Sequence, residues 1–387
     1  MGIAKCSLFE NIRFSNTLLK AIIIVSLTII VDTLGVAFLV LKTVSVPFVP
    51  SKNIDNMSDF YTSVWKRINE RSVDEGRFVI IDITDNSREE ITEILNNVRE
   101  MNPSIIGFDV SYISKKDPTI DSLLVCSLQS LPHLVLPLEY HDEQEKDTFL
   151  NNIIFDQLIG KEYGVVSFPE NKDVIRTFRP SFVVGENRVD AFGCVIAEKC
   201  GADISEIRKD KGRLINYTTL RLSDDDAKSG WQFVRIDSVS RLSLASDVSG
   251  KIVLIGSTHH TSDFHMTPLG YSLSGIMIHA HVINSLLDNK LIKSSHKILR
   301  YVICMVLAIL ALFLYQKHGN LIKTYSMCSV VLWGVLIFLV SIILFACLGT
   351  FLYCQYCYYI DFAPYITTLI IVYFIKDKNF KFKNLCI

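Results

Sequence analysis

Long apolar runs at both ends constrain this chain more than any other feature. Residues 21–41 (AIIIVSLTIIVDTLGVAFLVL) carry one charged side chain, Asp32. At about 1.5 Å per residue, this run is long enough to cross the hydrocarbon core of a bilayer. Three more apolar runs follow near the C-terminus, at residues 298–315, 327–351 and, more weakly, 362–375. The sequence therefore predicts a membrane protein with about four transmembrane helices.

Basic residues in the short flanks of these runs predict the orientation. They precede the first run, separate the second from the third, and follow the fourth: Lys5, Arg13, Lys20, Lys317, Lys323, Lys376, Lys378, Lys381 and Lys383. Such residues favour the cytoplasmic side, and four spans would place all three groups there. If the last run did not span, the tail would lie outside. The predicted order is a cytoplasmic N-terminus (1–20), a transmembrane helix (21–41), an extracytoplasmic domain (42–297), three transmembrane helices (298–375) and a cytoplasmic tail (376–387).

Polar residues within the apolar runs raise two further questions. A carboxylate is costly in lipid, so we expect Asp32 to face protein, either with a hydroxyl or water partner or as part of a signalling bundle. Cys354 and Cys357 form a CxxC at the outer end of the third run, among several tyrosines. Incidental thiols in an interfacial aromatic belt are the favoured interpretation, and a disulfide or redox role stays open.

The region between the first and second apolar runs alternates strand-like and helix-like segments. The stretch RFVIIDIT (77–84) predicts a strand, residues 87–101 have helical spacing of apolar positions, and SIIGFDV (104–110) predicts another strand. Strand, helix and strand with short loops form a parallel crossover unit. Further strands are expected at 133–140, YGVVSF, RPSFVVG and KIVLIG, and further helices near 119–129, 191–200 and 275–287. Residues 75–292 thus predict an α/β domain with a mostly parallel sheet and flanking helices.

Several ordered motifs in this domain resemble a known family. They are GKIVLIGSTHHTSDFHMTPLGYSLSGIMIHAHVINSLLDNKLI (250–292), VIIDITDNS with IIGFDV, and YGVVSFPENKDVIRTFRP followed by DAFGCVIAEKCG. Together they resemble the CHASE type-two domain, an extracellular sensory module of bacterial receptor cyclases, histidine kinases and serine/threonine kinases. The resemblance covers about residues 60–292. The matching residues of the first motif, its signature loop, are Gly256, Ser257, Thr258, Asp263, Thr267, Pro268, Gly275 and His279.

The resemblance implies a sensor in the inner membrane of a bacterium, but the chain departs from the family pattern in two places. The family usually shows Asp-Gly before an arginine, where this chain has Asp173, Val174, Ile175 and Arg176. The chain also ends twelve residues after Ile375, whereas family members often continue into a cytoplasmic catalytic domain. We therefore expect output through a separately encoded signalling or envelope protein, with a homodimer possible.

Acidic residues at strand ends give the main candidate for a ligand site. Side chains at the carboxyl ends of parallel strands share one edge of the sheet, where ligands of open α/β sheets bind. The candidates are Asp82, Asp85 and Asp109, joined by Asp263 and Thr267 if KIVLIG is a neighbouring strand, with Arg176 and Arg179 as counter-charges. The structural alternative, in which these side chains cap turns or pair with one another, is favoured over a ligand or cation site.

The histidine-rich stretch after KIVLIG offers weaker chemistry. His259, Asp263 and His265 are possible metal ligands, but their spacing fits no helical metal motif. A hydrolase with Ser257 or Thr258 as nucleophile is disfavoured, because a polar loop rather than a helix follows at once. We expect His279 to be packed on its helix rather than to contact a ligand. No catalytic residue, cofactor or nucleic-acid partner is predicted.

The leading hypothesis is a membrane-anchored receptor that detects an unknown signal outside the cytoplasm and relays it through its transmembrane helices. A structural or assembly subunit of an envelope complex is the main alternative. An extracytoplasmic metal-dependent hydrolase is the third.

Overall fold

The structure is a computed structural model that describes residues 3–33, 58–59, 61–62, 77–112, 114–143, 146–150, 158–168, 174–184, 186–217, 232–235, 248–260, 263–322 and 343–375. The chain divides into two compact units. One combines Met1–Val64 with Lys293–Ile387 and is called the helical unit here. The other, Trp65–Ile292, is called the α/β unit.

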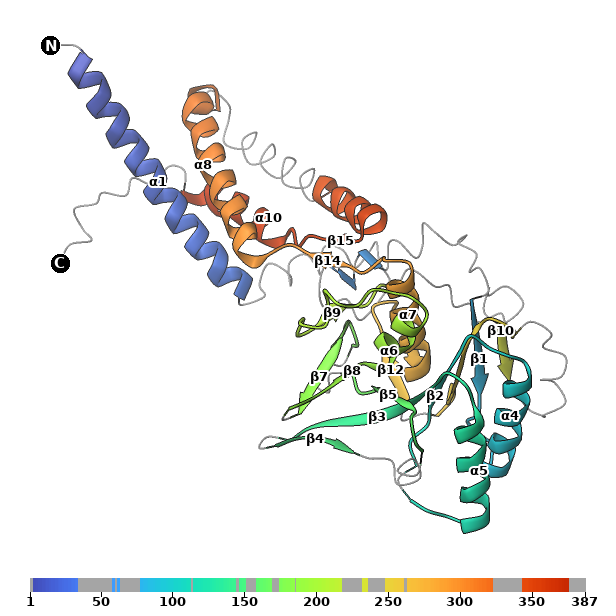
Figure 1. The fold of residues 1–387 in the computed structure, drawn as a ribbon. Helices are drawn as coiled ribbons and strands as arrows, with labels where there is room; N and C mark the ends of the chain where they lie inside the picture. The colour runs from blue at the N-terminus through green and yellow to red at the C-terminus, as the bar shows by residue number, and fades with distance from the viewer. Residues whose placement is uncertain are drawn as a thin grey trace. The chain divides into compact units, whose positions relative to one another are not determined.

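A seven-stranded, mostly parallel sheet organises the α/β unit (Figure 1). The strand order is β10-β1-β11-β2-β3-β4, and β5 also pairs with β3. Only β4 runs antiparallel to its neighbour. The strands are β1 (Phe78–Asp82), β2 (Ile105–Asp109), β3 (Leu134–Glu143), β4 (Lys146–Leu150), β5 (Glu162–Val165), β10 (Gln232–Arg235) and β11 (Ile252–Gly256). The predicted α/β class with a mostly parallel sheet is confirmed.

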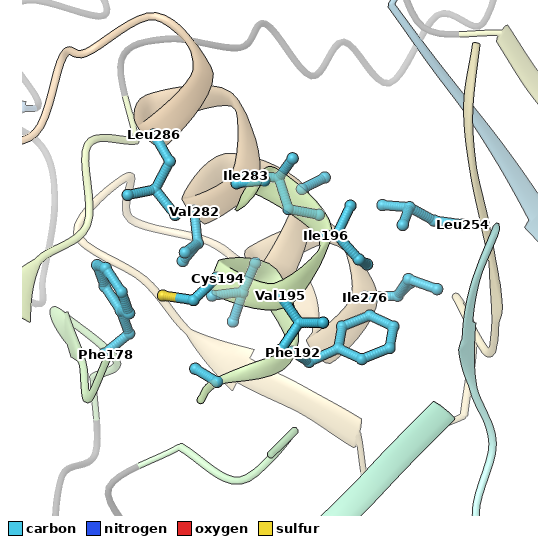
Figure 2. Close-up of a cluster of buried hydrophobic side chains, with 14 of the residues drawn as sticks. Phe178, Phe192, Cys194, Val195, Ile196, Leu254, Ile276, Val282, Ile283 and Leu286 are labelled. Carbon is cyan, nitrogen blue, oxygen red and sulfur yellow. The ribbon is translucent and has the colours of Figure 1, made fainter. Parts of the chain in front are cut away.

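Helices cover both faces of this sheet because its central strands are apolar on both sides. Val79 and Ile81 of β1 belong to the core under α4 (Arg88–Glu100) and α5 (Pro118–Ser130). Phe78 and Ile80 belong to the opposite core, under α6 (Phe192–Lys199) and α7 (Gly275–Leu287). Figure 2 shows that second core, where side chains of α6 and α7 meet each other and Leu254 of β11. Such two-sided burial is typical of parallel sheets.

Local sequence signals fix where two of the helices begin. Ser87 and Glu90 form a reciprocal capping box at the start of α4, which satisfies backbone donors at the helix N-terminus. Asp117 accepts hydrogen bonds from the first amides of α5, and Pro118 occupies its first turn, where a missing N–H costs nothing.

Three short antiparallel pairs lie outside the main sheet. They are β6 (Thr177–Phe178) with β9 (Arg213–Leu214), β7 (Ser181–Val184) with β8 (Asn187–Asp190), and β12 (Phe264–Met266) with β13 (Ser272–Ser274). The predicted strand RPSFVVG is therefore present as β7, but it pairs with the segment that follows it instead of joining the parallel sheet. A hairpin partner a few residues away takes its backbone hydrogen bonds.

The helical unit contains α1 (Ile3–Thr33), β14 (Lys293–Ser294), α8 (Lys297–Ile322), an apolar helix at Ile343–Tyr356, β15 (Tyr358–Tyr359) and α10 (Ala363–Ile375). Among the described residues, one helix, Lys297–Gln316, is long and apolar enough to cross a membrane. The other predicted spans are not established: residues 34–41 and 323–342 lie outside the described part of the chain, and α10 is short. The four-span layout and the domain boundaries built on it stay predictions.

Apolar and hydroxyl contacts hold α1, α8 and α10 together within this unit. Ala21 and Ile24 of α1 share a buried cluster with Ala308 and Leu312 of α8 and with Val372 of α10. The outer side of α8 exposes large apolar side chains, namely Ile298, Leu299, Val302, Val306, Leu310, Phe313 and Leu314. A continuous exposed apolar surface on a helix of this length is what contact with lipid requires.

The structure also places the polar residues that the sequence singled out here. Tyr301 Oη donates a 2.5 Å hydrogen bond to Asp32 Oδ2, so a hydroxyl group on α8 meets the carboxylate of α1. The hydroxyl oxygens of Thr28 and Thr368 lie 3.1 Å apart. Cys354 and Cys357 are free thiols.

Candidate functional site

The candidate site lies at the carboxyl edge of the parallel sheet. Asp82, Gly256 and Asp109 are register partners, so they form one row across the ends of β1, β11 and β2. Because side chains alternate along a strand, this row projects to the same face as Ile80 and Leu254, which is the face covered by α6 and α7. The strand KIVLIG is β11, and it lies between the two strands that carry the aspartates.

A pocket of about 860 Å³ opens at this edge. Its polar lining includes three carboxylates from different elements: Asp109 at the end of β2, Glu139 on β3 and Asp263 before β12. His260, His265 and His279 are further chargeable groups in the described lining. Tyr112, Tyr140 and Phe168 supply aromatic surface. A volume of this size is within the range of small-molecule sites.

Asp109 is the most perturbed acid in the pocket. Its carboxyl group is partly buried, and burial together with repulsion from Asp263 and Glu139 raises its pKa to about 7. Loss of water disfavours the charged form, and neighbouring negative charges add to the penalty. The pocket therefore concentrates negative charge at a cost in stability.

Asp263 connects the pocket to α7. Its Oδ2 atom accepts a 3.1 Å hydrogen bond from the Gly275 amide, so a carboxylate from outside the helix caps its N-terminus, where negative charge is stabilising. The N-cap residue Ser274 makes no such bond through its side chain. A Cβ at Gly275 would lie 2.8 Å from Asp263 Oδ1, so glycine is needed for this approach. His265 Nε2 lies 3.8 Å from the same carboxylate.

His279 forms part of the pocket wall one turn along α7. Its ring stacks on Phe168, with centroids 4.7 Å apart, and meets Phe192 edge-on. Burial lowers the pKa of His279 to about 4, although Asp263 and a hydrogen bond with the Val166 backbone act in the opposite direction. His279 is therefore a neutral, packed ring at neutral pH, and one that also lines the pocket.

Asp82 is engaged in holding two loops together. Its Oδ1 accepts hydrogen bonds from the Thr84 hydroxyl (2.6 Å), the Thr84 amide (3.1 Å) and the Thr258 amide (3.0 Å). Its Oδ2 lies 2.8 Å from His259 Nδ1. Burial alone would raise the pKa of Asp82, but the hydrogen bonds from Thr84 and Thr258 outweigh it and lower the pKa. Asp82 fits the structural alternative rather than ligand contact.

The remaining predicted residues are not among the described residues that line the pocket. Asp85 is exposed in the turn after β1. Arg176 donates to the Val174 carbonyl (3.4 Å), and Arg179 donates to the Ser181 carbonyl (3.0 Å) while it lies over the Phe182 ring. Neither arginine is among the described residues that line the pocket. Asp173 lies outside the described residues.

The histidines do not assemble into a metal centre in the part of the chain that the structure describes. No group of three or more His, Cys, Asp or Glu residues there could hold a metal ion. His259 bonds with Asp82 and with the Thr258 hydroxyl (2.6 Å), whereas His265 lies beside Asp263 and Phe168. Thr258 is buried and Ser257 lines the pocket near His260.

Thr267 and Pro268 shape the turn between β12 and β13. The Thr267 side chain is fully buried, and its hydroxyl and amide both donate to the Tyr271 carbonyl, at 2.7 and 3.2 Å. Gly270 has a positive φ of 86° in the same turn, a conformation that favours glycine. The Thr-Pro-Leu-Gly segment of the signature loop therefore sets the geometry of the hairpin that leads into α7.

We expect Thr267→Val to lower the free energy of unfolding by about 1–2 kcal/mol, since it removes a buried hydrogen bond without changing side-chain volume much. Thermal unfolding of the full chain in detergent measures the effect. Thr119→Val, at an exposed position on α5, is the control and should change stability by less than about 0.5 kcal/mol. Equal stability of the two variants would contradict the role given to Thr267.

The pocket residues absent from the sequence-based candidates include Tyr112, Glu139, Tyr140 and Phe168. Glu139 had a usable signal, because it is an acidic residue near the end of the predicted strand 133–140. Tyr112 and Phe168 follow strands in loops, whereas Tyr140 lies on β3 beside Glu139. Their approach to the pocket depends on tertiary packing, which no short sequence pattern reports.

Comparison with protein-family models matches the CHASE2 domain over residues 36–315. The match covers more than half of the chain, so the chain belongs to the CHASE2 domain family, a family of extracellular sensory domains found in membrane receptors. Comparisons with curated proteins and with solved structures gave no match.

Proposed function

We propose that this protein is a membrane-anchored sensor whose pocket at the sheet edge binds a small molecule outside the cytoplasm. The observation that carries the proposal is the convergence of Asp109, Glu139 and Asp263 on one pocket at the carboxyl edge of a parallel sheet. Three acids from separate elements around an open volume favour a site that a ligand completes. The sensory character of the family supports the same role.

The proposed relay begins at α7. Two of its residues, Gly275 and His279, line the pocket, and Asp263 caps its first turn. Binding at the carboxylates would therefore change contacts of α7 directly. The chain then reaches α8, the candidate membrane span, after only residues 288–296. A ligand that binds one arrangement of α7 better than another would shift the population of that arrangement.

The membrane part of the proposal is a multi-pass protein of the bacterial inner membrane with the α/β unit outside the cytoplasm. The apolar surface of α8 and its packing with α1 and α10 support a helical bundle in lipid. We propose that the bundle passes the signal to a separately encoded partner, with dimerisation as a possible intermediate. Among the described residues, the carboxylates and histidines do not form the group that a metal-dependent hydrolase would need to hold its metal ion.

A complementation experiment in the native host tests the sensor proposal. A deletion strain receives the wild type, Glu139→Gln or Asp85→Asn, and transcripts are compared genome-wide at matched protein levels in the membrane fraction. We expect Asp85→Asn to restore the wild-type profile and Glu139→Gln to resemble the deletion strain. Glu139 is among the described residues that line the pocket, whereas Asp85 is not. Full restoration by Glu139→Gln would refute a sensory role for the pocket and favour a structural envelope subunit.

A further inference from the structure

We propose that the ligand of this pocket is a small organic cation, with an ammonium or amidinium group and without a carboxylate of its own. The inference rests on the proposed function and adds the chemical class of the signal. It follows from the charges, the apolar surfaces and the volume that the described residues place together.

Charge is the first argument. The pocket is lined by three carboxylates, and none of the described lining residues is a lysine or an arginine. Among the described residues, Asp263 makes one ionic contact, with His265 Nε2 at 3.8 Å. In the described part of the chain, the Asp109 carboxylate has neither a hydrogen bond nor an ion pair, although it is partly buried. A positive group between Asp109, Glu139 and Asp263 would remove the mutual repulsion that raises the pKa of Asp109.

Two described arginines that lie over tyrosine rings of the pocket are engaged elsewhere. Arg88 forms a buried ion pair with Asp121, donates to the Ser114 carbonyl, and lies over the Tyr112 ring. Arg179 donates to the Ser181 carbonyl and lies over the Phe182 and Tyr140 rings. The N-terminus of α7, which would attract an anion, already holds the Asp263 carboxylate. The described lining therefore offers no lysine or arginine to an acidic ligand, which disfavours dicarboxylates and amino acids.

The shape of the pocket favours an organic cation over a metal ion. A volume of about 860 Å³ is far larger than one ion needs, and the described residues contain no metal-holding group. Apolar surface from Ile83, Val110 and Phe168 borders the carboxylates. Carbon chains or rings can pack there while a charged end reaches the acids, which is the usual division of labour in small-molecule sites.

Calorimetric titration of the full chain in detergent at pH 8 tests the proposal with probes of matched length. The probes are 1,4-diaminobutane, 1,4-butanediol and succinate, with agmatine and choline as further cations. We expect at least one cation to bind, and the diol and succinate to bind at least about tenfold more weakly. Asp109→Asn and Glu139→Gln should each weaken cation binding about tenfold or more, since each removes a charged partner, and Asp85→Asn should not.

The pH dependence adds a readout that a generic apolar site would not give. Asp109 takes up a proton as the pH falls through about 7, so cation affinity should fall between pH 8 and pH 6, and this dependence should be reduced in Asp109→Asn. His260, His265 and His279 also line the pocket, but His279 stays neutral in this range. His260 and His265 are present in both proteins, so their contributions cancel in the comparison.

Three outcomes would overturn the proposal. Succinate or the diol binding as tightly as the cations would assign another ligand class to the pocket. Calcium binding with the same sensitivity to Asp109→Asn would replace the organic cation by a metal ion. Failure of all three cations to bind, while Glu139→Gln still abolishes the cellular response, would refute the cation class and leave the sensor proposal standing. Full complementation by Glu139→Gln, in contrast, would refute the sensor proposal itself.

Discussion

Asp109→Asn is expected to raise the melting temperature of the ligand-free protein at pH 8 and to leave it nearly unchanged near pH 4. The folded protein raises the pKa of Asp109 from 3.8 to about 7, so at pH 8 the carboxylate is charged in both states but penalised only in the folded one. At about 1.4 kcal/mol per pKa unit, the full shift corresponds to about 4 kcal/mol, and relaxation would leave about 1–3 kcal/mol. Asparagine removes this penalty because it carries no charge.

The sign reverses the usual behaviour of a carboxylate. As the pH falls from about 7 towards 4, the folded wild type binds a proton that the unfolded chain does not yet bind, so Asp109 stabilises the fold progressively. His279 acts in the opposite direction, since its pKa of about 4 lies below its unfolded value of 6.5. Both proteins contain His279, so the difference between variant and wild type at each pH isolates Asp109.

Thermal unfolding of the full chain in detergent, followed between pH 4 and pH 8, measures this difference. Asp85→Asn is the matched control, because Asp85 is exposed in a turn and should change stability by less than about 0.5 kcal/mol. A melting temperature of Asp109→Asn at pH 8 equal to or below that of the wild type would contradict the repulsive cluster. A stabilised variant that also loses its ligand is the trade-off expected of a functional site.

Gly164→Ala is expected to destabilise the α/β unit more than any surface substitution. Gly164 lies on β5, and a Cβ there would come within 2.5 Å of Phe192 Cα and 2.9 Å of Phe192 N. Both are backbone atoms at the start of α6, so no side-chain rotation can relieve the clash. The helix would have to move away from the sheet and disturb the core shown in Figure 2. We expect a loss of about 3 kcal/mol or more, at the upper end for overpacked positions.

Gly212→Ala provides the comparison for this prediction. A Cβ at Gly212 would have no heavy atom closer than 3.9 Å, so the same chemical change should cost little. Melting temperatures of the two variants in detergent, together with protease resistance of the α/β unit, separate the effects. Wild-type stability of Gly164→Ala would show that α6 does not pack on β5 as closely as described.

Much of the α/β fold could be predicted because its signals are local. The β-branched runs of β1, β2 and β11 and the amphipathic spacing of α4 are visible in windows of a few residues. The strand order could not be predicted from such local signals. β11 lies between β1 and β2, and its partners are more than 140 positions away in the chain, so pairing depends on tertiary packing rather than on any local pattern.

The sequence indicated the sheet edge at which the candidate site lies, but not which residues form the site. The rule that ligands meet parallel strands at their carboxyl ends pointed to the sheet edge where Asp109 and Asp263 line one pocket. It did not distinguish Asp109 from Asp82, which shares its row, because the difference lies in loop contacts: Thr84 and Thr258 saturate Asp82. Phe168 follows β5 in a loop, and its approach to His279 is a tertiary contact without a sequence signature.

Hydrogen exchange on the full chain, with and without a small-molecule extract of the native host, tests most directly whether this pocket is the sensory site. The proposed role predicts slower exchange in peptides that contain Asp109, Glu139 and the first turn of α7 when the extract is present. The same extract should leave the Asp109→Asn, Glu139→Gln double variant unchanged. Unaltered exchange in these segments of the wild type, or equal protection in the double variant, would contradict it.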